Sequence, residues 1–269
     1  MRSFVAGGVA LLCASLSGVT YAVDLKQIEA RASLRVLVSA DEQPEMFALT
    51  PAAPAPPGFE REILEGFART HRCKLELVTV QTFDQIIPML LKEDGDVIVG
   101  IIDTESRRRQ ISFTIETLPA RHLAVNRKPQ PPLATLDDFR KVKVGVITGT
   151  SWAEAAAAAG VKGTNTVSFP DLPQVLEALQ SGRVSATVMS APDFALAQRH
   201  DPSLQAGPFL GPPSRAAWGV RKSDPGLLAS LNDYIFNMRS SPAWGQLVGR
   251  YFTPDALDLF KRARSTGVR

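Results

Sequence analysis

Cysteine is scarce in this chain of 269 residues, which contains only Cys13 and Cys73. Cys13 lies in an apolar N-terminal segment that we expect to be removed, so the mature chain cannot form an internal disulfide bond. Cys73 is flanked by apolar and charged residues in the sequence RCKLEL. We expect it to be a packed thiol and not a nucleophile.

Histidine is equally scarce, with three residues, His71, His122 and His200. None of them has a cysteine or histidine neighbour at the spacing that metal sites use. The sequence also lacks a G-x-S-x-G motif, a P-loop and a dinucleotide-binding fingerprint, and no pair of acidic residues is marked by its spacing. We therefore expect no metal, no cofactor and no enzymatic activity.

Dense basic patches are missing as well: the net charge is only +3, and no run of Lys and Arg is interleaved with aromatic residues. Nucleic acid is therefore not an expected partner. The chain begins with Arg2, an apolar stretch over residues 4–16, and small residues up to Ala22. This pattern predicts a secretory signal over residues 1–22 that is cleaved after Ala22 and is too short to span a membrane. Leu12 precedes Cys13, which does not fit a lipoprotein signal, so we expect a soluble periplasmic protein.

The rest of the sequence alternates strand-like apolar runs with amphipathic helical patterns, in two blocks. The first block predicts strands at 34–39, 74–80 and 96–102 and helices at 59–69 and 83–92, with a Pro/Ala-rich surface loop at 50–57. The second predicts strands at 143–147, 166–169 and 184–189 and helices at 151–159, at 171–181 and from 190, followed by a strand at 216–221 and a helical tail. Such alternation predicts an α/β fold with two lobes, whose ligand binds beyond the carboxyl ends of the strands.

Several segments together resemble the family 3 extracellular solute-binding proteins, with the type II periplasmic-binding-protein fold. They include GFEREILEGFA (58–68), DVIVGIIDTESRRRQISFT (96–114), VKVGVITGTSW (142–152) and WGVRKSDPGLLASLNDYI (218–235), and the resemblance covers residues 34–252. It implies a two-lobed (Venus-flytrap) protein with a ligand cleft between the lobes. Lobe 1 would hold residues 23–124 and 215–269, lobe 2 would be the insertion 125–214, and the hinge would lie near 125–128 and 212–216.

The resemblance implies that an arginine grips the carboxylate of the ligand. The family pattern of a threonine, two residues and an arginine matches Thr104 and Arg107. A guanidinium group offers a carboxylate two parallel donors. Consecutive helical residues point about 100° apart, so we expect Arg108 and Arg109 to be solvated surface charges. An ordinary surface role for Arg107 is the alternative.

The other implied ligand contacts come from both lobes. Thr150 and Ser151 match the lobe 2 turn that donates to the carboxylate. Asp41 follows the first strand, where the family often binds the ligand amine; an ordinary loop aspartate is the alternative. Phe47 lies near the position of an aromatic residue over the ligand, although the Pro/Ala-rich loop disturbs the register there.

Two positions depart from the family pattern. Ile102 stands where the family commonly has a hydroxyl, and Ser190 stands where an aspartate pairs with the ligand's ammonium group. A buried ammonium group without an anionic partner is costly. Ser190 is better interpreted as a helix N-cap, because Ser190 and Asp193 form an S-x-x-D pattern around a proline. The stretch from Ser151 to Glu154 has the same form.

These features leave several functional hypotheses. The first is a monomeric receptor for an ABC importer, which binds a small carboxylate or an atypical amino-acid-like ligand and docks on an inner-membrane permease. The second is an accessory protein of a periplasmic quinoprotein dehydrogenase that binds no small ligand. The third is a dehydratase of the cyclohexadienyl type, with Glu154 near the expected acid. A transglycosylase-associated sensor is a last alternative, although the sequence contains no lysozyme-like domain.

Overall fold

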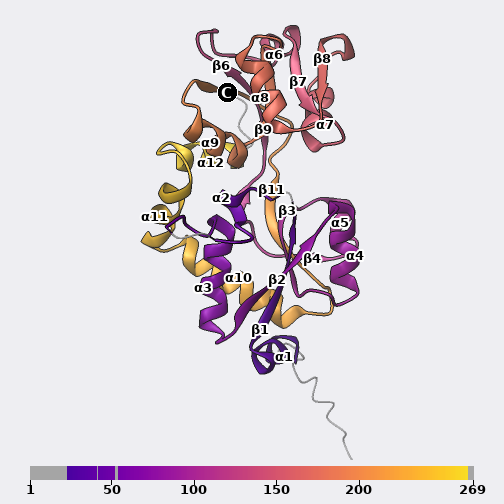
Figure 1. The fold of residues 1–269 in the computed structure, drawn as a ribbon, viewed down its shortest axis with the longest axis vertical. Helices are drawn as coiled ribbons and strands as arrows, with labels where there is room; N and C mark the ends of the chain where they lie inside the picture. Colours follow the sequence, from indigo (N-terminus) through magenta and orange to yellow (C-terminus); the bar gives the residue numbers. More distant parts are fainter. Residues whose placement is uncertain (1–22, 41, 52–53, 266–269) are drawn as a thin grey trace, which may run out of the picture.

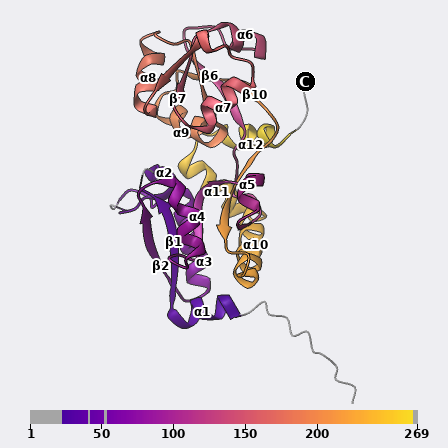
Figure 2. The same ribbon diagram turned by 90° about the vertical axis from the view of Figure 1, so that its right-hand side faces the viewer.

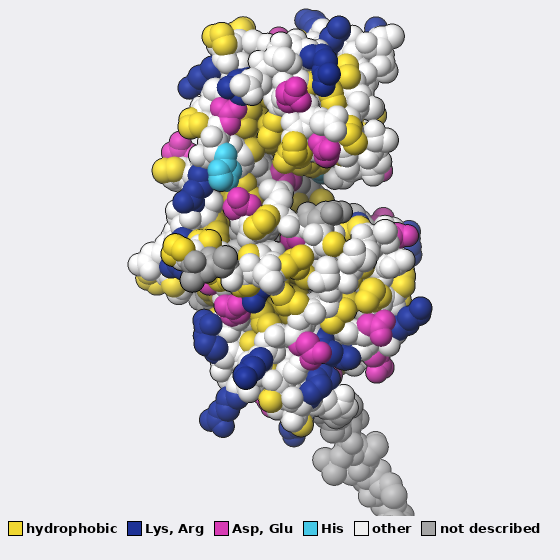
Figure 3. Space-filling model, in the orientation of Figure 1, with side chains coloured by type: hydrophobic (Ala, Val, Ile, Leu, Met, Phe, Trp, Pro, Cys, Tyr) yellow, Lys and Arg dark blue, Asp and Glu magenta, His cyan; other side chains and the backbone are white. Residues whose placement is uncertain are grey.

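Two β-sheets, each covered by helices, are arranged along the long axis of the molecule (Figures 1 and 2). The computed structural model describes residues 23–40, 42–51 and 54–265, so the predicted signal sequence lies outside the described residues. The space-filling view shows the two halves separated by a notch on one side and in contact on the other (Figure 3). Among the described residues, no helix is long and apolar enough to cross a membrane.

Sheet A, in the lower half of Figure 1, has the order β2-β1-β3-β11-β4, with β5 also paired to β11. Strands β1, β2 and β3 run parallel, and β11 runs antiparallel to β3. The strands are β1 (Ser33–Ser39), β2 (Lys74–Val80), β3 (Val97–Ile102), β4 (Ser112–Phe113), β5 (Leu118–Pro119) and β11 (Arg215–Val220). The strands expected at 34–39, 74–80, 96–102 and 216–221 are therefore present, and no end differs from its expected position by more than one residue.

The faces of sheet A follow from side-chain alternation along the strands. In β1, Val36 and Val38 belong to the core beneath helix α3 (Phe59–Thr70), whereas Leu37 belongs to a second core with α4 (Ile86–Leu91). Helix α3 buries the apolar stripe that its sequence predicts. The remaining elements of this half are α1 (Val23–Arg31), α2 (Pro44–Phe47), η1 (Phe83–Gln85), α5 (Glu105–Arg108), α10 (Pro225–Arg239) and α11 (Pro242–Tyr251).

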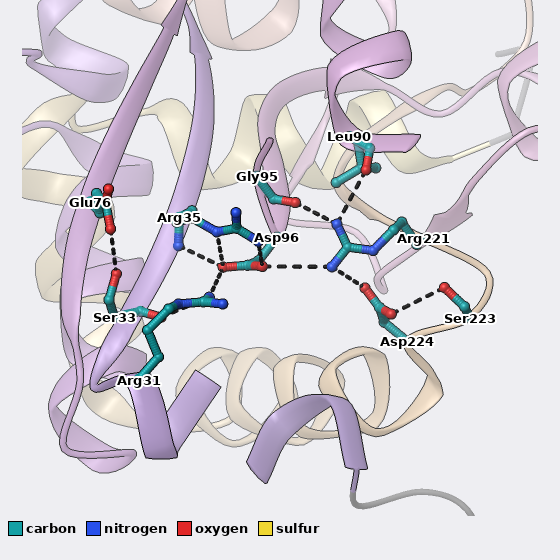
Figure 4. Close-up of polar contacts among 10 residues, drawn as sticks. All are labelled: Arg31, Ser33, Arg35, Glu76, Leu90, Gly95, Asp96, Arg221, Ser223 and Asp224. Carbon is teal, nitrogen blue, oxygen red and sulfur yellow. Dashed lines mark hydrogen bonds and ion pairs between the residues drawn. The ribbon is translucent and has the colours of Figure 1, made fainter. Parts of the chain in front are cut away.

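A buried carboxylate fixes the end of sheet A that lies far from the notch (Figure 4). Asp96, with 2% of its side chain exposed, accepts hydrogen bonds from Arg31 Nη2 at 2.5 Å and from Arg35 Nη2 at 2.9 Å. Arg221 Nη2 lies 3.6 Å from Asp96 and 2.7 Å from Asp224. A buried carboxylate is costly unless it is paired. The cluster therefore joins α1, β1, the start of β3 and the segment after β11.

Sheet B forms the upper half, with the order β10-β6-β9-β7-β8. Its strands are β6 (His122–Arg127), β7 (Val144–Ile147), β8 (Thr166–Phe169), β9 (Ala186–Ser190) and β10 (Leu204–Leu210). Helices α6 (Leu136–Lys141), α7 (Ser151–Ala158), α8 (Leu172–Gln180) and α9 (Ala191–His200) and the short η2 (Gly163–Asn165) surround it. The sequence pattern predicted β7, β8 and β9 but missed β6 and β10, which are antiparallel to each other.

The chain crosses between the sheets twice, between β5 and β6 and again between β10 and β11. We expected the inserted lobe to begin at residue 125, but the pairing of β6 with β9 already starts at His122. Leu123 is fully buried in that pairing, so sheet B includes residues assigned to the first lobe from sequence. The return crossing, residues 211–214, overlaps the expected hinge at 212–216. Each sheet with its helices is called a lobe below.

The C-terminal helix makes a further connection between the lobes. Helix α12 (Ala256–Arg264) follows α11 of lobe 1 and packs against α9 of lobe 2 (Figure 1). Arg121 Nη1 donates to the carbonyl oxygen of Ser265 at 2.8 Å, and Arg199 donates to the carbonyl oxygen of Arg250. The lobes are therefore joined by two crossings and by this packed helix.

Candidate functional site

The notch between the lobes is the candidate site. It is visible on the right-hand side of Figure 3, where α5 of lobe 1 and α7 of lobe 2 lie on its two sides in Figure 1. Both helices follow the carboxyl end of a parallel strand, β3 and β7, which is where sheets of this type bind ligands. The residues predicted to contact the ligand can now be placed relative to it.

Arg107 lies on α5 without an acidic partner among the described residues. Thr104 caps this short helix, and its Oγ1 accepts a hydrogen bond from the Arg107 backbone at 3.4 Å. Arg107 Nη1 donates to the carbonyl oxygen of Ile102 at 2.7 Å, and the guanidinium carbon lies 5.2 Å from the centre of the Phe83 ring. Burial lowers the pKa of Arg107. Because a guanidinium group has five N–H donors, most of those of Arg107 remain available to an anion.

The neighbouring arginines differ from Arg107 and from each other. Arg109 is exposed and pairs with Glu105 at 3.2 Å, as expected for a surface charge. Arg108 is also exposed, with 56% of its side chain accessible, but it forms an ion pair as well. Its guanidinium group donates to both oxygens of Asp103, at 2.5 and 3.0 Å. Asp103 has a fully buried side chain that requires cationic partners, and Arg108 is one of them.

The turn of lobe 2 differs from the expected capping pattern. Thr150, and not Ser151, is the N-cap of α7, and the Thr150 hydroxyl donates to the carbonyl oxygen of Ile147 at 2.7 Å. Ser151 is the first residue of the helix, and its Oγ lies 3.1 Å from Nε2 of His122. Burial lowers the pKa of His122, while the charge of Glu154 acts in the opposite direction. The capping box expected from Ser151 to Glu154 is therefore not formed, because the helix begins one residue earlier.

Ser190 is the N-cap of α9, which confirms the interpretation from sequence. Its Oγ accepts from the Asp193 backbone at 3.3 Å and donates to Asp193 Oδ2 at 2.6 Å. Ser190 also pairs with His122 in the register of β9 and β6. The serine hydroxyl is thus occupied at the start of its own helix.

Asp193 connects the two lobes, a role that the sequence did not reveal. Its Oδ1 accepts a hydrogen bond from Gln43 Nε2 of lobe 1 at 2.9 Å. Glu42 lies beside this contact, and burial together with the charges of Glu60 and Asp193 raises the pKa of Glu42 to about 8. Burial likewise raises the pKa of Asp193. Glu42, Gln43 and Asp193 therefore form an acidic seam between the lobes.

Glu60 is a third buried carboxyl group, and its charge acts on Glu42. It is 1% exposed and accepts from the backbone of Gly100 at 2.8 Å and from Thr117 Oγ1 at 3.1 Å. Burial raises its pKa, which these hydrogen bonds oppose. Gly100 has φ of +65°, and a Cβ atom there would lie 2.3 Å from Glu42 Oε2. Glycine is thus required at this point of β3, and a glycine inside an apolar strand was the available sequence signal.

The remaining two predicted residues are Asp41 and Phe47. Asp41 lies outside the described residues. Phe47 is fully buried in the core, with the Arg61 guanidinium 5.7 Å from the centre of its ring. The expected role of Phe47 as an aromatic surface over the ligand is therefore wrong. Its helix, α2, packs against α3, which turns the ring into the core of lobe 1.

Comparison with known proteins identifies the family. The family model for bacterial extracellular solute-binding proteins, family 3, matches residues 34–254. The chain belongs to this family. It is 24% identical over 205 residues to the membrane-bound lytic murein transglycosylase F of Pseudomonas putida, covering 72% of this chain and 42% of that protein. It is also 23% identical to a probable histidine-binding protein of Neisseria gonorrhoeae, covering 74% and 75% of the two chains.

Solved structures agree with the two-lobed fold of this family 3 protein. An ancestral cationic amino acid solute-binding protein superposes with a TM-score of 0.73 at 24% identity, over 85% of this chain and 99% of that one. A mutant of the arginine-bound ArgBP from T. maritima gives a TM-score of 0.62 at 26% identity, over 80% and 99%. The predicted fold class and family are thereby confirmed. The chain spans less than half the length of the transglycosylases that it matches.

Two chemically different features therefore lie at the junction between the lobes of this family 3 protein. One is a guanidinium group on α5 with free donors, which suits an anionic group of a ligand. The other is the acidic seam, where burial raises the pKa of Glu42 and Asp193. A cationic group beside these carboxyl groups would favour their ionised forms. The described residues contain no group of three His, Cys, Asp or Glu side chains that could hold a metal ion.

Proposed function

We propose that this protein is a periplasmic receptor that binds a small carboxylate ligand between its lobes and delivers it to an ABC importer. The observation that carries the proposal is Arg107, a partly buried guanidinium group with no acidic partner among the described residues. Burying a charge without a counter-ion is unfavourable. A ligand carboxylate would provide that counter-ion in a bidentate contact.

The acidic seam extends the proposal to the other end of the ligand. Family members commonly pair the ligand ammonium group with an aspartate where this chain has Ser190. Here Asp193, one helical turn further, and Glu42 place carboxyl groups at the same junction. A cationic group would stabilise their ionised forms. We therefore propose an amino-acid-like ligand whose carboxylate faces α5 and whose cationic group faces the seam.

Family membership and the likeness to binding proteins support the transport role. A ligand that contacts Arg107 of lobe 1 and Ser151 of lobe 2 would favour the closed arrangement, because only contacts that differ between two states can shift their equilibrium. A permease in the inner membrane could then distinguish closed from open protein. We propose a binding role and no catalysis, in a monomer.

Isothermal titration of the mature protein tests the ligand class. The panel contains amino acids, guanidino acids and small organic acids, each beside its neutral carboxamide. We expect at least one carboxylate to bind, and its carboxamide to bind at least about tenfold more weakly, because hydrogen bonds to charged groups contribute roughly 1.5–3 kcal/mol. Equal binding of acid and amide would contradict the proposed anchor.

One observation favours the second candidate, an accessory protein that binds no small ligand. The hydroxyl groups of Thr150 and Ser190 already donate, to the carbonyl oxygen of Ile147 and to Asp193 Oδ2. Fewer free donors then remain for a ligand than the family pattern implies. A panel without any binder would support this candidate, and co-purification with a quinoprotein dehydrogenase would establish it.

A further inference from the structure

A cavity lies where the return crossing meets the C-terminal helix. Its volume is about 230 Å³, and it is lined by Asp103, Arg108, Glu116, Pro213, Ser214, Arg215 and Arg264. These residues come from the segment after β3, the segment before β5, the start of β11 and the end of α12. The cavity therefore occupies the junction that connects the lobes.

Guanidinium groups outnumber carboxylates around this cavity. Asp103 forms ion pairs with Arg108 Nε at 2.5 Å and with Arg215 Nη2 at 2.6 Å. Glu116 forms ion pairs with Arg264 Nε at 2.6 Å and with Arg239 Nη2 at 3.4 Å. Arg239 does not line the cavity itself, so three arginines and two carboxylates line it, which leaves an excess of one positive charge.

The pKa values of Asp103 and Arg239 both shift in the direction expected beside an excess of positive charge. Burial disfavours the charge of Asp103, yet the hydrogen bonds from Arg108 and Arg215 outweigh it and lower the pKa of Asp103. Burial and repulsion by Arg264 lower the pKa of Arg239, although Glu116 opposes the shift. The arginines therefore favour the ionised form of Asp103.

The arginines that line the cavity also keep unused donors. Arg108 and Arg215 bind Asp103 through Nε and Nη2, and in the described part of the chain their Nη1 groups have no recorded partner. Arg264 binds Glu116 through Nε. Guanidinium groups with unused N–H donors are well suited to bind the oxygen atoms of carboxylates and phosphates.

We propose that this cavity is a second ligand site, which binds a small oxyanion such as inorganic phosphate. The negative charge of such an ion complements the excess of positive charge among the side chains that line the cavity. The bound ion would join α5, the return crossing and α12. Because Arg108 follows Arg107 directly on α5, a bound ion would also stabilise the helix on which Arg107, the proposed carboxylate-binding residue, lies.

The test measures phosphate binding by isothermal titration at constant ionic strength, with chloride as the reference anion and sulfate as a second probe. Arg264→Gln and Arg108→Gln are the informative variants, since Glu116 keeps Arg239 and Asp103 keeps Arg215 in each case. We expect saturable binding to the wild-type protein and a loss of at least about tenfold in each variant. Arg109→Gln on the same helix, where the side chain is exposed and paired with Glu105, should bind phosphate as the wild type does.

Three outcomes would overturn the proposal. The first is the absence of saturable phosphate binding by the wild-type protein. The second is unchanged phosphate binding in Arg264→Gln. Arg264 is the last residue of α12, so we expect this variant to fold, and it decides the question even if the Arg108 variant does not fold. The third is a loss in Arg107→Gln alone, which would place the phosphate in the notch between the lobes.

Discussion

The two sides of the gap between the lobes use their polar groups differently. On the closed side, α2 and α9 are joined by the hydrogen bond from Gln43 to Asp193 at 2.9 Å and by Glu45 and His200 at 3.3 Å. On the open side, the guanidinium group of Arg107 contacts a backbone carbonyl and an aromatic ring, with no acidic partner in the described part of the chain. The closed side thus holds the lobes together, and the open side keeps a charge available for a ligand.

The largest predicted effect concerns Phe47, which lies on α2 at the closed side. Because its ring is fully buried, Phe47→Ala should lower the free energy of unfolding by about 3–5 kcal/mol. Urea denaturation measures this loss. Phe236, whose side chain is 63% exposed, provides the matched control, and Phe236→Ala should change stability by no more than about 0.5 kcal/mol. A stable Phe47→Ala protein that has lost only ligand binding would show that the ring belongs to the site.

A smaller effect is expected from pH, through the acidic seam. An unfolded glutamate releases its proton near pH 4.5, whereas Glu42 in the folded protein holds its proton up to about pH 8. The folded state therefore binds more protons between these values, and the free energy of unfolding should fall as the pH rises through this window. The slope from one group is at most about 1.4 kcal/mol per pH unit.

Glu42→Gln tests this assignment by denaturation at several pH values from 5 to 8. The variant keeps the shape of the side chain and cannot ionise, so the decline of stability with pH should become shallower. Glu105→Gln is the control, because Glu105 is exposed and pairs only with Arg109 at the surface. An identical pH dependence in Glu42→Gln and the wild-type protein would show that Glu42 does not retain its proton.

The sequence predicted those features that depend on neighbouring residues. Periodicity located β1, β2, β3 and the helices α3 and α4, and the S-x-x-D pattern identified the cap at Ser190. Resemblance to the family selected Arg107 among three consecutive arginines. The structure adds that Arg107 lacks the acidic partners that Arg108 and Arg109 have.

Features that depend on distant residues could not be predicted in this way. Gln43 and Asp193 are 150 residues apart, and nothing in either local sequence indicates the other. Glu42 and Gly100 are likewise far apart in the sequence, and the carboxyl group of Glu42 occupies the space that a side chain at residue 100 would need. Phe47 was assigned to the ligand because the register near the Pro/Ala-rich loop was uncertain, and only the packing of α2 on α3 shows that its ring is in the core.

The most direct test of the central claim is calorimetric titration of the best carboxylate ligand into Arg107→Ala and Arg109→Ala side by side. Removing Arg107 should weaken binding by at least about tenfold, because the variant loses the charge-assisted contact to the carboxylate. Arg109→Ala should keep the wild-type affinity, since its side chain points to solvent and pairs with Glu105. Equal affinities in the two variants would contradict the account, because the ligand would then bind without the free guanidinium group on the open side of the gap.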